Sequence, residues 1–133
     1  NIEEHAVNYI RKTYNIDQPG GELIIDNCVF DNVYNSEKGK ILVSDGIHKV
    51  KISNSVFVNS YKIQVPMRLS GAANMIDNSL FYDVGFPKFT QGAIDTNLLY
   101  KKPKWLDESR YVPDLKSPLL KEKNGVRNIG LIY

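Results

Sequence analysis

Four side chains in the middle of the chain could bind an acidic sugar. They are Arg68, Lys62, Lys88 and Tyr61. An arginine or lysine neutralises a carboxylate and donates hydrogen bonds to it, so the three cations could hold the carboxylate of a uronic acid. The tyrosine ring could stack on the sugar. The alternative for Arg68 is an outward-facing residue on a solvated strand, which would bind no ligand.

Other polar and aromatic residues supply further candidates. A glycoside hydrolase would need two carboxylates across a groove. The chain offers the aspartates Asp45, Asp77, Asp83 and Asp95. Two of them, Asp77 and Asp95, recur within a repeat and are therefore interpreted as structural. Further aromatic residues that could form a sugar platform, or else pack in a core or at a corner, are Tyr82, Phe86 and Phe89. No catalytic motif is present, so we predict no catalytic residue.

The cysteine and histidine residues do not form a metal-binding pattern. Cys28 is the single cysteine, and it occupies a repeat position that holds Ser55 and Ser79 in other copies. We interpret it as a small packed residue rather than a reactive thiol. His5 and His48 stand alone, without the spacing of zinc ligands. We therefore predict no metal site and no cofactor.

Composition indicates one soluble domain over residues 1–133. The chain is 42% hydrophobic and 24% charged, which is ordinary for a globular protein. Its 17 basic and 15 acidic residues give a net charge of +2, which does not favour a nucleic-acid partner. No apolar run approaches the roughly 20 residues of a membrane-spanning helix, so we predict no transmembrane segment.

A nine-residue pattern recurs and organises the chain. Its first eight positions are Ile-polar-Asn-small-aliphatic-Phe-any-Asn/Asp, and it is found at residues 25–33, 52–60 and 76–84, with an imperfect fourth copy at 94–100. Its asparagines are Asn27, Asn54 and Asn78, with Thr96 in the fourth place, at intervals of 27, 24 and 18 residues. Such a period indicates a repeat architecture. Leucine-rich and helical repeats are excluded by composition, which leaves a coil of short parallel strands with one turn per repeat.

Stacked turns would bring equivalent residues into columns about 4.8 Å apart. The expected aliphatic column is Ile25, Ile52, Ile76 and Ile94. The expected ring column is Phe30, Phe57 and Phe81, followed by Leu99. The three asparagines would form an amide ladder at a bend, and this ladder would stop at Thr96. We assign the repeated turns to residues 22–100.

The segments between and around the copies complete the expected strands. Further strand arms are expected at residues 40–43, 65–69 and 88–90, and Pro66 suggests that the middle one starts after it. The leading arm, residues 1–21, fits either an amphipathic helix over 3–14 or a strand over 7–13, and we favour the strand. Residues 101–133 are expected to form an irregular tail that caps the last turn, with Trp105 plugging the open end.

The repeat and the tail together resemble the pectate-lyase-like right-handed parallel β-helix superfamily. The repeat Ile-Asp-Asn-Cys-Val-Phe-Asp-Asn-Val is similar to its rungs. Three tail segments follow an order seen in closing segments of secreted Bacteroidetes β-helix proteins. These segments are Pro103-Lys104-Trp105-Leu106-Asp107, Ser117-Pro118-Leu119-Leu120 and Asn128-Ile129-Gly130. The resemblance covers residues 22–130. It is nearest to the C-terminal region of chondroitinase B-like and alginate-lyase-like proteins and related β-helix proteins of unknown function.

The resemblance implies an all-β, right-handed parallel β-helix of about four turns. Lyases of this superfamily cleave acidic polysaccharides by β-elimination, with calcium or a basic side chain neutralising the uronate and a basic residue removing a proton. Their catalytic groups usually lie on earlier rungs. We therefore expect a non-catalytic C-terminal part of a secreted, periplasmic or surface polysaccharide-processing protein. The alternatives are a catalytic lyase, with calcium as a possible cofactor, and a surface adhesin or structural β-helix. The open N-terminal end is expected to meet preceding rungs or a second chain.

Overall fold

The secondary structure consists almost entirely of short strands. The computed structural model describes residues 5–9, 21–33, 36–44, 49–120 and 129–130. Its strands are β1 (His5–Tyr9), β2 (Glu22–Asp26), β3 (Val29–Asp31), β4 (Lys40–Ser44), β5 (Lys49–Ser53), β6 (Val56–Val58), β7 (Met67–Ser70), β8 (Asn74–Asp77), β9 (Leu80–Tyr82), β10 (Lys88–Thr90), β11 (Ile94–Thr96), β12 (Trp105–Asp107) and β13 (Val112–Pro113). One 3-10 helix, η1 (Glu108–Arg110), follows β12. Within the described residues, no helix is long and apolar enough to span a membrane.

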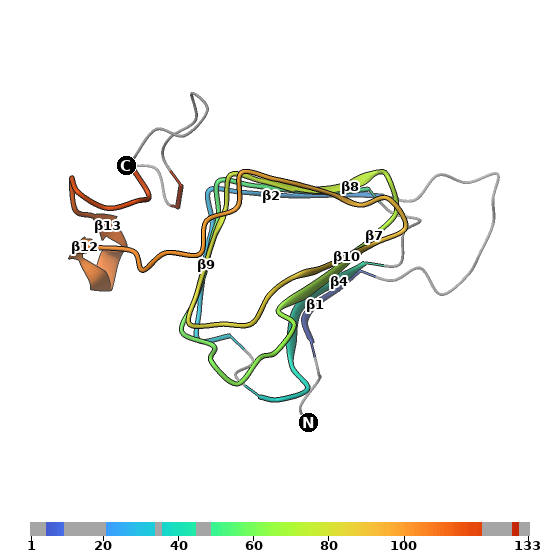
Figure 1. Cartoon of the computed structure of the whole chain (residues 1–133), viewed down its shortest axis with the longest axis horizontal. Helices are drawn as coiled ribbons and strands as arrows, with labels where there is room; N and C mark the ends of the chain where they lie inside the picture. Colours follow the sequence, from blue (N-terminus) through green and yellow to red (C-terminus); the bar gives the residue numbers. More distant parts are fainter. Residues whose placement is uncertain (1–4, 10–20, 34–35, 45–48, 121–128, 131–133) are drawn as a thin grey trace.

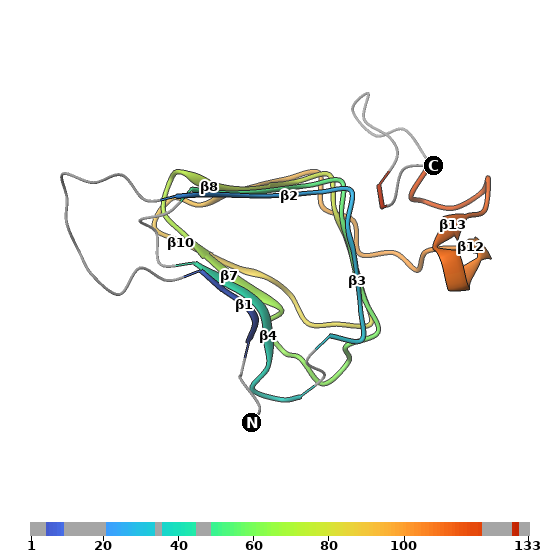
Figure 2. The same ribbon diagram turned by 180° about the vertical axis from the view of Figure 1, so that it is seen from behind.

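The first eleven strands form three parallel sheets. Sheet A has the order β1-β4-β7-β10, sheet B the order β2-β5-β8-β11, and sheet C the order β3-β6-β9. The chain visits A, B and C in the same order each time, and we call each such visit a pass. Viewed along the stack, the strands of successive passes lie over one another on three sides of a triangular outline (Figure 1; Figure 2, from behind). The all-β, parallel-strand architecture predicted from the repeat is therefore confirmed.

The strand arms expected between the copies are also present. Strands β4, β7 and β10 coincide with these arms, and β7 begins directly after Pro66, as expected. Proline has no N–H group to donate to a neighbouring strand, so it marks the strand boundary. The leading arm does form a strand, β1, which starts at His5. The rest of the strand that we expected over residues 7–13 lies outside the described residues.

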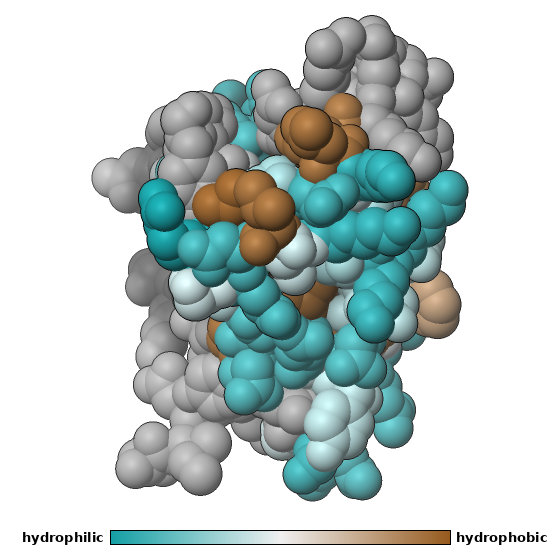
Figure 3. Space-filling model, turned by 90° about the vertical axis from the view of Figure 1, so that its left-hand side faces the viewer, coloured by the Kyte–Doolittle hydropathy of each residue, from teal (hydrophilic) through white to brown (hydrophobic). Residues whose placement is uncertain are grey.

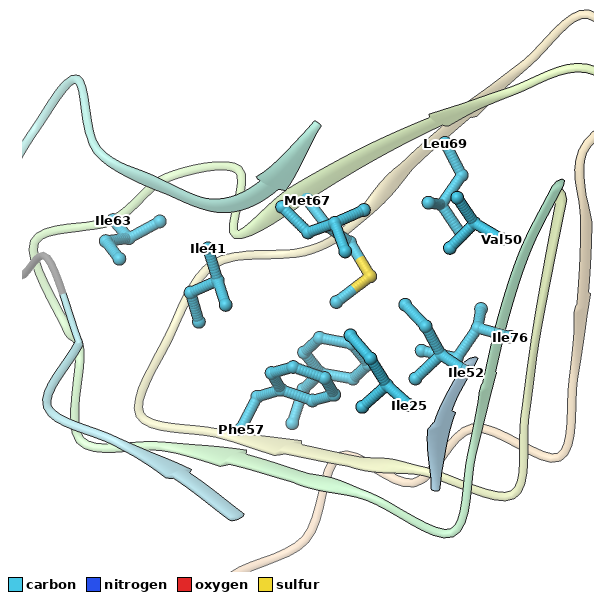
Figure 4. Packing of buried hydrophobic residues seen from close by; sticks show 11 residues of the cluster. Ile25, Ile41, Val50, Ile52, Phe57, Ile63, Met67, Leu69 and Ile76 are labelled. Carbon is cyan, nitrogen blue, oxygen red and sulfur yellow. The ribbon is translucent and has the colours of Figure 1, made fainter. Parts of the chain in front are cut away.

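Strand register places equivalent residues of the first three copies in line. Ile25 pairs with Ile52, which pairs with Ile76. Phe57 stacks on both neighbouring phenylalanines, with ring centroids 4.9 Å from Phe30 and 4.8 Å from Phe81. Figure 4 shows Ile25, Ile52, Ile76 and Phe57, with other buried residues of the same cluster, in the space that the three sheets enclose. The core therefore contains in-register columns that cross the first three passes.

Two left-handed bends in each of the first three passes explain the asparagines of the repeat. At the first bend, Asn27, Asn54 and Asn78 have φ values of 51°, 52° and 47°. At the second bend, on the far side of the three-residue strand of sheet C, Asn32, Asn59 and Asp83 have φ values of 53°, 59° and 55°. Asparagine and aspartate tolerate positive φ better than other residues with a side chain. The pattern Asn…Asn/Asp thus fixes both corners that flank sheet C.

Side-chain hydrogen bonds at the first bend connect successive passes. Asn78 donates through Nδ2 to Oδ1 of Asn54 over 2.7 Å, and Asn54 donates through Nδ2 to Oδ1 of Asp26 over 2.9 Å. Asn27 donates to the carbonyl of Gly130 over 2.8 Å. A serine column lies beside this ladder, because the N–H of Ser55 donates to Oγ of Ser79 and the N–H of Cys28 donates to Oγ of Ser55. Cys28 thus occupies the position that serine holds in the later passes.

The fourth copy of the repeat lies one residue away from the alignment expected from the sequence, so that alignment is wrong. Strand β11 pairs Asp95, not Ile94, with Ile76, and Ile94 is 47% exposed. The left-handed bend falls on Asn97, with φ of 52°, instead of Thr96. The cause is conformational, since a β-branched threonine disfavours positive φ. Because of the same shift, Leu99 does not stack on Phe81 in the ring column.

The ring column therefore continues through a tyrosine. Leu99 forms a bridge to Leu80, and Tyr100 stacks on Phe81 with ring centroids 6.1 Å apart. The amide ladder continues as well, because Asn97 donates through Nδ2 to Oδ1 of Asp77 over 3.1 Å. The ladder does not stop at the fourth pass, contrary to the expectation from Thr96.

The described part of the tail lies beside the strand stack and not over its end. Strands β12 and β13 lie outside the triangular outline, next to sheet C (Figures 1 and 2). Leu119 and Ile129 are buried in a second core with the outward-facing Val56, Val58 and Leu80. Trp105 packs against this second core, so its expected role as an end plug is wrong. The physical reason is that both faces of sheet C are apolar, and the outer one requires a cover.

Candidate functional site

Two of the predicted sugar-binding residues lie side by side on sheet A. Arg68 of β7 is the register partner of Lys88 of β10, and both side chains are exposed. The exposure of Arg68 follows from the alternation of side chains along a strand, because Met67 and Leu69 on either side of it are buried. The neighbouring position on β4 is the half-buried Val43. The outer face of sheet A therefore presents a pair of cations one strand spacing apart.

The other two predicted residues lie together at a different place. Tyr61 is 66% exposed, and it lines an open hollow of about 640 Å³ together with Lys62. The opposite wall consists of Ser36, Glu37 and Lys38. This hollow is built from loops, so strand register does not align it with Arg68. The four predicted residues thus form two pairs.

The remaining candidates fall into structural and surface groups. Asp77 accepts hydrogen bonds from Thr96 at 2.5 Å and from Asn97, which fits its structural interpretation. Phe86 is exposed and packs against Tyr100, with ring centroids 5.2 Å apart. Phe89 is half-buried against the main core. Asp45 lies outside the described residues.

Another hollow lies between sheet C and the tail, and the sequence did not predict it. We call it the tail hollow, and its volume is about 730 Å³. Its sheet C wall consists of Val58, Asn59, Tyr82 and Asp83. Its tail wall consists of Lys102, Pro103, Lys104, Trp105 and Glu108. Sequence reasoning singled out several of these residues separately, but no local pattern indicates that the tail folds back onto the second bend of the repeat.

A hydrogen-bonded network supports both walls of the tail hollow. Asp31, at the end of β3, accepts a hydrogen bond on Oδ1 from Asn59 Nδ2 over 2.9 Å. Its other oxygen, Oδ2, accepts one from the hydroxyl of Tyr111 over 2.7 Å. The ring of Tyr111 meets Trp105 edge to face, with centroids 5.5 Å apart. One carboxylate of the first pass therefore connects the second bend to the tryptophan of the tail.

The network raises the pKa of Tyr111 above its usual value of 10.0. The main cause is the hydrogen bond to Asp31, followed by burial and by the negative charges of Asp31 and Glu108. Because the folded state retains the proton more strongly, the stabilisation from this group is fully present below pH 10.0 and is lost as the pH rises through the raised pKa.

We expect Tyr111→Phe to reduce the alkaline sensitivity of the fold. Urea unfolding between about pH 9 and about pH 11.5 should show a smaller loss of stability in the variant than in the wild type, because phenylalanine has no proton to lose. At neutral pH the variant should be less stable by about 1 kcal/mol, since Asp31 loses a hydrogen-bond donor. Equal alkaline losses in the two proteins would contradict this role for Tyr111.

The described residues contain no group of three or more histidine, cysteine, aspartate or glutamate side chains placed to hold a metal ion. The candidate sites are the cation pair of sheet A, the loop hollow at Tyr61 and the tail hollow.

Comparisons of the chain with protein-family models, with curated proteins and with solved structures gave no significant match.

Proposed function

We propose that the chain is a right-handed parallel β-helix that binds acidic polysaccharide without cleaving it, as the C-terminal part of a secreted, periplasmic or surface polysaccharide-processing protein. Three parallel sheets visited in a constant order support the β-helix. The repeated left-handed bends and the in-register columns support it further. About four passes, β1–β3 to β10–β11, make up the coil.

The observation that carries the binding proposal is the pairing of Arg68 with Lys88. Adjacent strands of a sheet lie about 4.8 Å apart, so the two cations can bind one carboxylate or two neighbouring ones. They occupy the outer face of a sheet, where an extended polymer can lie across the strands. Tyr61 and Lys62 provide a second contact on a separate surface.

Replacing both cations should weaken binding to an acidic polysaccharide. We expect Arg68→Ala/Lys88→Ala to lower the affinity for alginate or polygalacturonate about 10-fold at low salt, because each lost charge-assisted contact at an exposed site contributes up to about 1 kcal/mol. Affinity electrophoresis in gels containing each polymer measures this change. The wild-type affinity should also fall as salt is added.

The matched control is Lys49→Ala/Lys51→Ala. It removes the same number of positive charges from exposed positions on sheet B. Its affinity should decrease much less than that of the sheet A variant. Equal losses in the two double variants would show that net charge, and not the Arg68–Lys88 pair, governs binding, and would contradict the proposal.

A catalytic lyase is the alternative function, and the same pair of residues favours it. Arg68 would neutralise the uronate carboxylate while Lys88 acted as the base that removes the adjacent ring proton, so that a carbon–carbon double bond forms as the glycosidic bond breaks; calcium could assist at the carboxylate. Incubation with the acidic polymers distinguishes the two functions, because β-elimination creates an unsaturated product that absorbs ultraviolet light. Binding without new absorbance supports the non-catalytic function. A steady rise in absorbance that disappears in Lys88→Ala supports the lyase.

The proposal includes a partner at the N-terminal side of the coil. Within the described residues, β2 and β3 have a neighbouring strand on one side only. Preceding passes of a longer polypeptide, or a second chain, could pair with these strands through their free backbone groups. A surface adhesin with the same fold would also use such pairing. It would show no affinity for the acidic polymers above.

A further inference from the structure

The polar groups of the tail hollow carry balanced charge. Two tail lysines, Lys102 and Lys104, face the hollow together with the carboxylates of Asp83 and Glu108. A purely anionic ligand would meet both carboxylates as well as both lysines. The balance contrasts with the outer face of sheet A, where the adjacent register partners Arg68 and Lys88 are both cations. The hollow therefore suits a ligand without net charge.

The hollow also combines aromatic surface with unused hydrogen-bonding groups. The rings of Tyr82 and Trp105 come from opposite walls. Within the described part of the chain, the side chains of Asp83 and both lysines make no hydrogen bond or ion pair with protein. A volume of about 730 Å³ is in the range of small-ligand sites. Donors, acceptors and ring faces are thus available to a ligand that needs all three.

The walls of the hollow are supported in advance of binding. Asn59 and Tyr111 both donate to Asp31, and Tyr111 holds the edge-to-face contact with Trp105. A preorganised site loses less conformational entropy when a ligand binds. The surrounding face is mainly hydrophilic, with separate hydrophobic patches, as Figure 3 shows.

We propose that the tail hollow binds an uncharged saccharide. Each sugar hydroxyl both donates and accepts hydrogen bonds, which matches the mixture of ammonium, carboxylate and amide groups. The C–H faces of a sugar ring are apolar and pack on aromatic rings. The site is separate from the cation pair of sheet A, and it differs from that pair in ligand charge. A protein with both sites would hold acidic and neutral glycan segments at the same time.

The single tryptophan of the chain makes the proposal directly testable. Because Trp105 is the one tryptophan, its fluorescence reports on the hollow without interference from another indole. The probes are cellohexaose, xylohexaose and mannohexaose, with trigalacturonate as the acidic comparison. We expect a saturable fluorescence change with at least one neutral probe in the millimolar range and a weaker effect of trigalacturonate. Isothermal titration calorimetry in parallel detects any binding that leaves the fluorescence unchanged.

Two variants should weaken the binding of the neutral probe, each about 5- to 10-fold. Tyr82→Ala removes a ring face, and Asp83→Asn removes a charged acceptor. The second variant preserves the fold, because Asn32 and Asn59 occupy the same left-handed bend in the other passes. The control for the loss of an exposed aromatic ring is Phe86→Ala, which lies outside the hollow and should bind the probe like the wild type.

Several outcomes would overturn the proposal. One is the absence of saturable binding of all three neutral hexasaccharides by both methods. Another is a preference for trigalacturonate, which would identify the hollow as an anion site. A third is equal affinity of Tyr82→Ala and Phe86→Ala for the neutral probe. The double variant Arg68→Ala/Lys88→Ala should retain neutral-sugar binding, so a failure of acidic-polymer binding is distinguishable from a failure here.

Discussion

Replacing Phe57 with alanine is expected to lower the free energy of unfolding by about 4 kcal/mol, the typical cost of removing a buried phenylalanine. Phe57 is 1% exposed, and its ring stacks between those of Phe30 and Phe81. The substitution therefore leaves a cavity and interrupts a column that joins three passes. Urea denaturation followed by circular dichroism measures the change.

Two further variants separate the contributions to this loss. Phe57→Leu keeps most of the apolar volume but removes the stacked ring, so we expect a smaller loss of about 1–2 kcal/mol. Tyr61→Ala changes an exposed ring and should alter stability by less than about 0.5 kcal/mol. If Phe57→Ala cost no more than Tyr61→Ala, the stacked column would not be part of the core.

Replacing Asn54 with alanine should cost about 2–4 kcal/mol, which is the sum of a conformational and a hydrogen-bonding loss. Asn54 adopts a φ of 52°, a conformation that asparagine tolerates better than alanine does. Its amide also accepts from Asn78 and donates to Asp26. Both effects act at the corner between sheets B and C. Urea denaturation of the variant measures the total.

Glycine at the same position separates the two effects. Asn54→Gly adopts positive φ without strain and loses only the side-chain hydrogen bonds, so we expect a loss of about 1–2 kcal/mol. The difference between the two variants then measures the strain at the bend. A glycine variant that is as unstable as the alanine variant would contradict the role of positive φ and leave the hydrogen bonds as the whole effect.

The repeat predicted much of the strand architecture because its information is local. A bend residue, a small residue and a three-residue strand centred on phenylalanine follow one another in the first three copies, so Phe30, Phe57 and Phe81 could be aligned by inspection. The fourth copy was misaligned because Ile94 matched the apolar pattern better than Asp95. In the structure, Asn97 occupies the bend because it tolerates positive φ. As a result Asp95, and not the apolar Ile94, pairs with Ile76.

The candidate sites depended on longer-range information. Arg68 and Lys88 were named from their residue types, but their adjacency depends on the register between β7 and β10. The tail hollow could not be predicted, because Tyr111 contacts Asp31 across 80 positions of the chain. The tail has no periodicity to show which face it covers. Its docking follows from the apolar outer face of sheet C, a property of the folded sheet.

The parallel register underlies the stacked columns, the bends and the cation pair, and spin labels on sheet B test it most directly. Ile24 pairs with Lys51, Lys51 with Met75, and Met75 with Ile94. Labelled cysteines can be placed at these positions after Cys28→Ser, which introduces the residue that Ser55 and Ser79 already supply in later passes.

Continuous-wave electron paramagnetic resonance then measures the dipolar broadening of two labelled pairs. Ile24 and Lys51 lie one strand spacing apart, about 5 Å, whereas Ile24 and Ile94 lie three spacings apart, about 14 Å. We predict strong broadening for the first pair and much weaker broadening for the second. Absent broadening for Ile24 and Lys51, or equal broadening for both pairs, would contradict the parallel stack of passes.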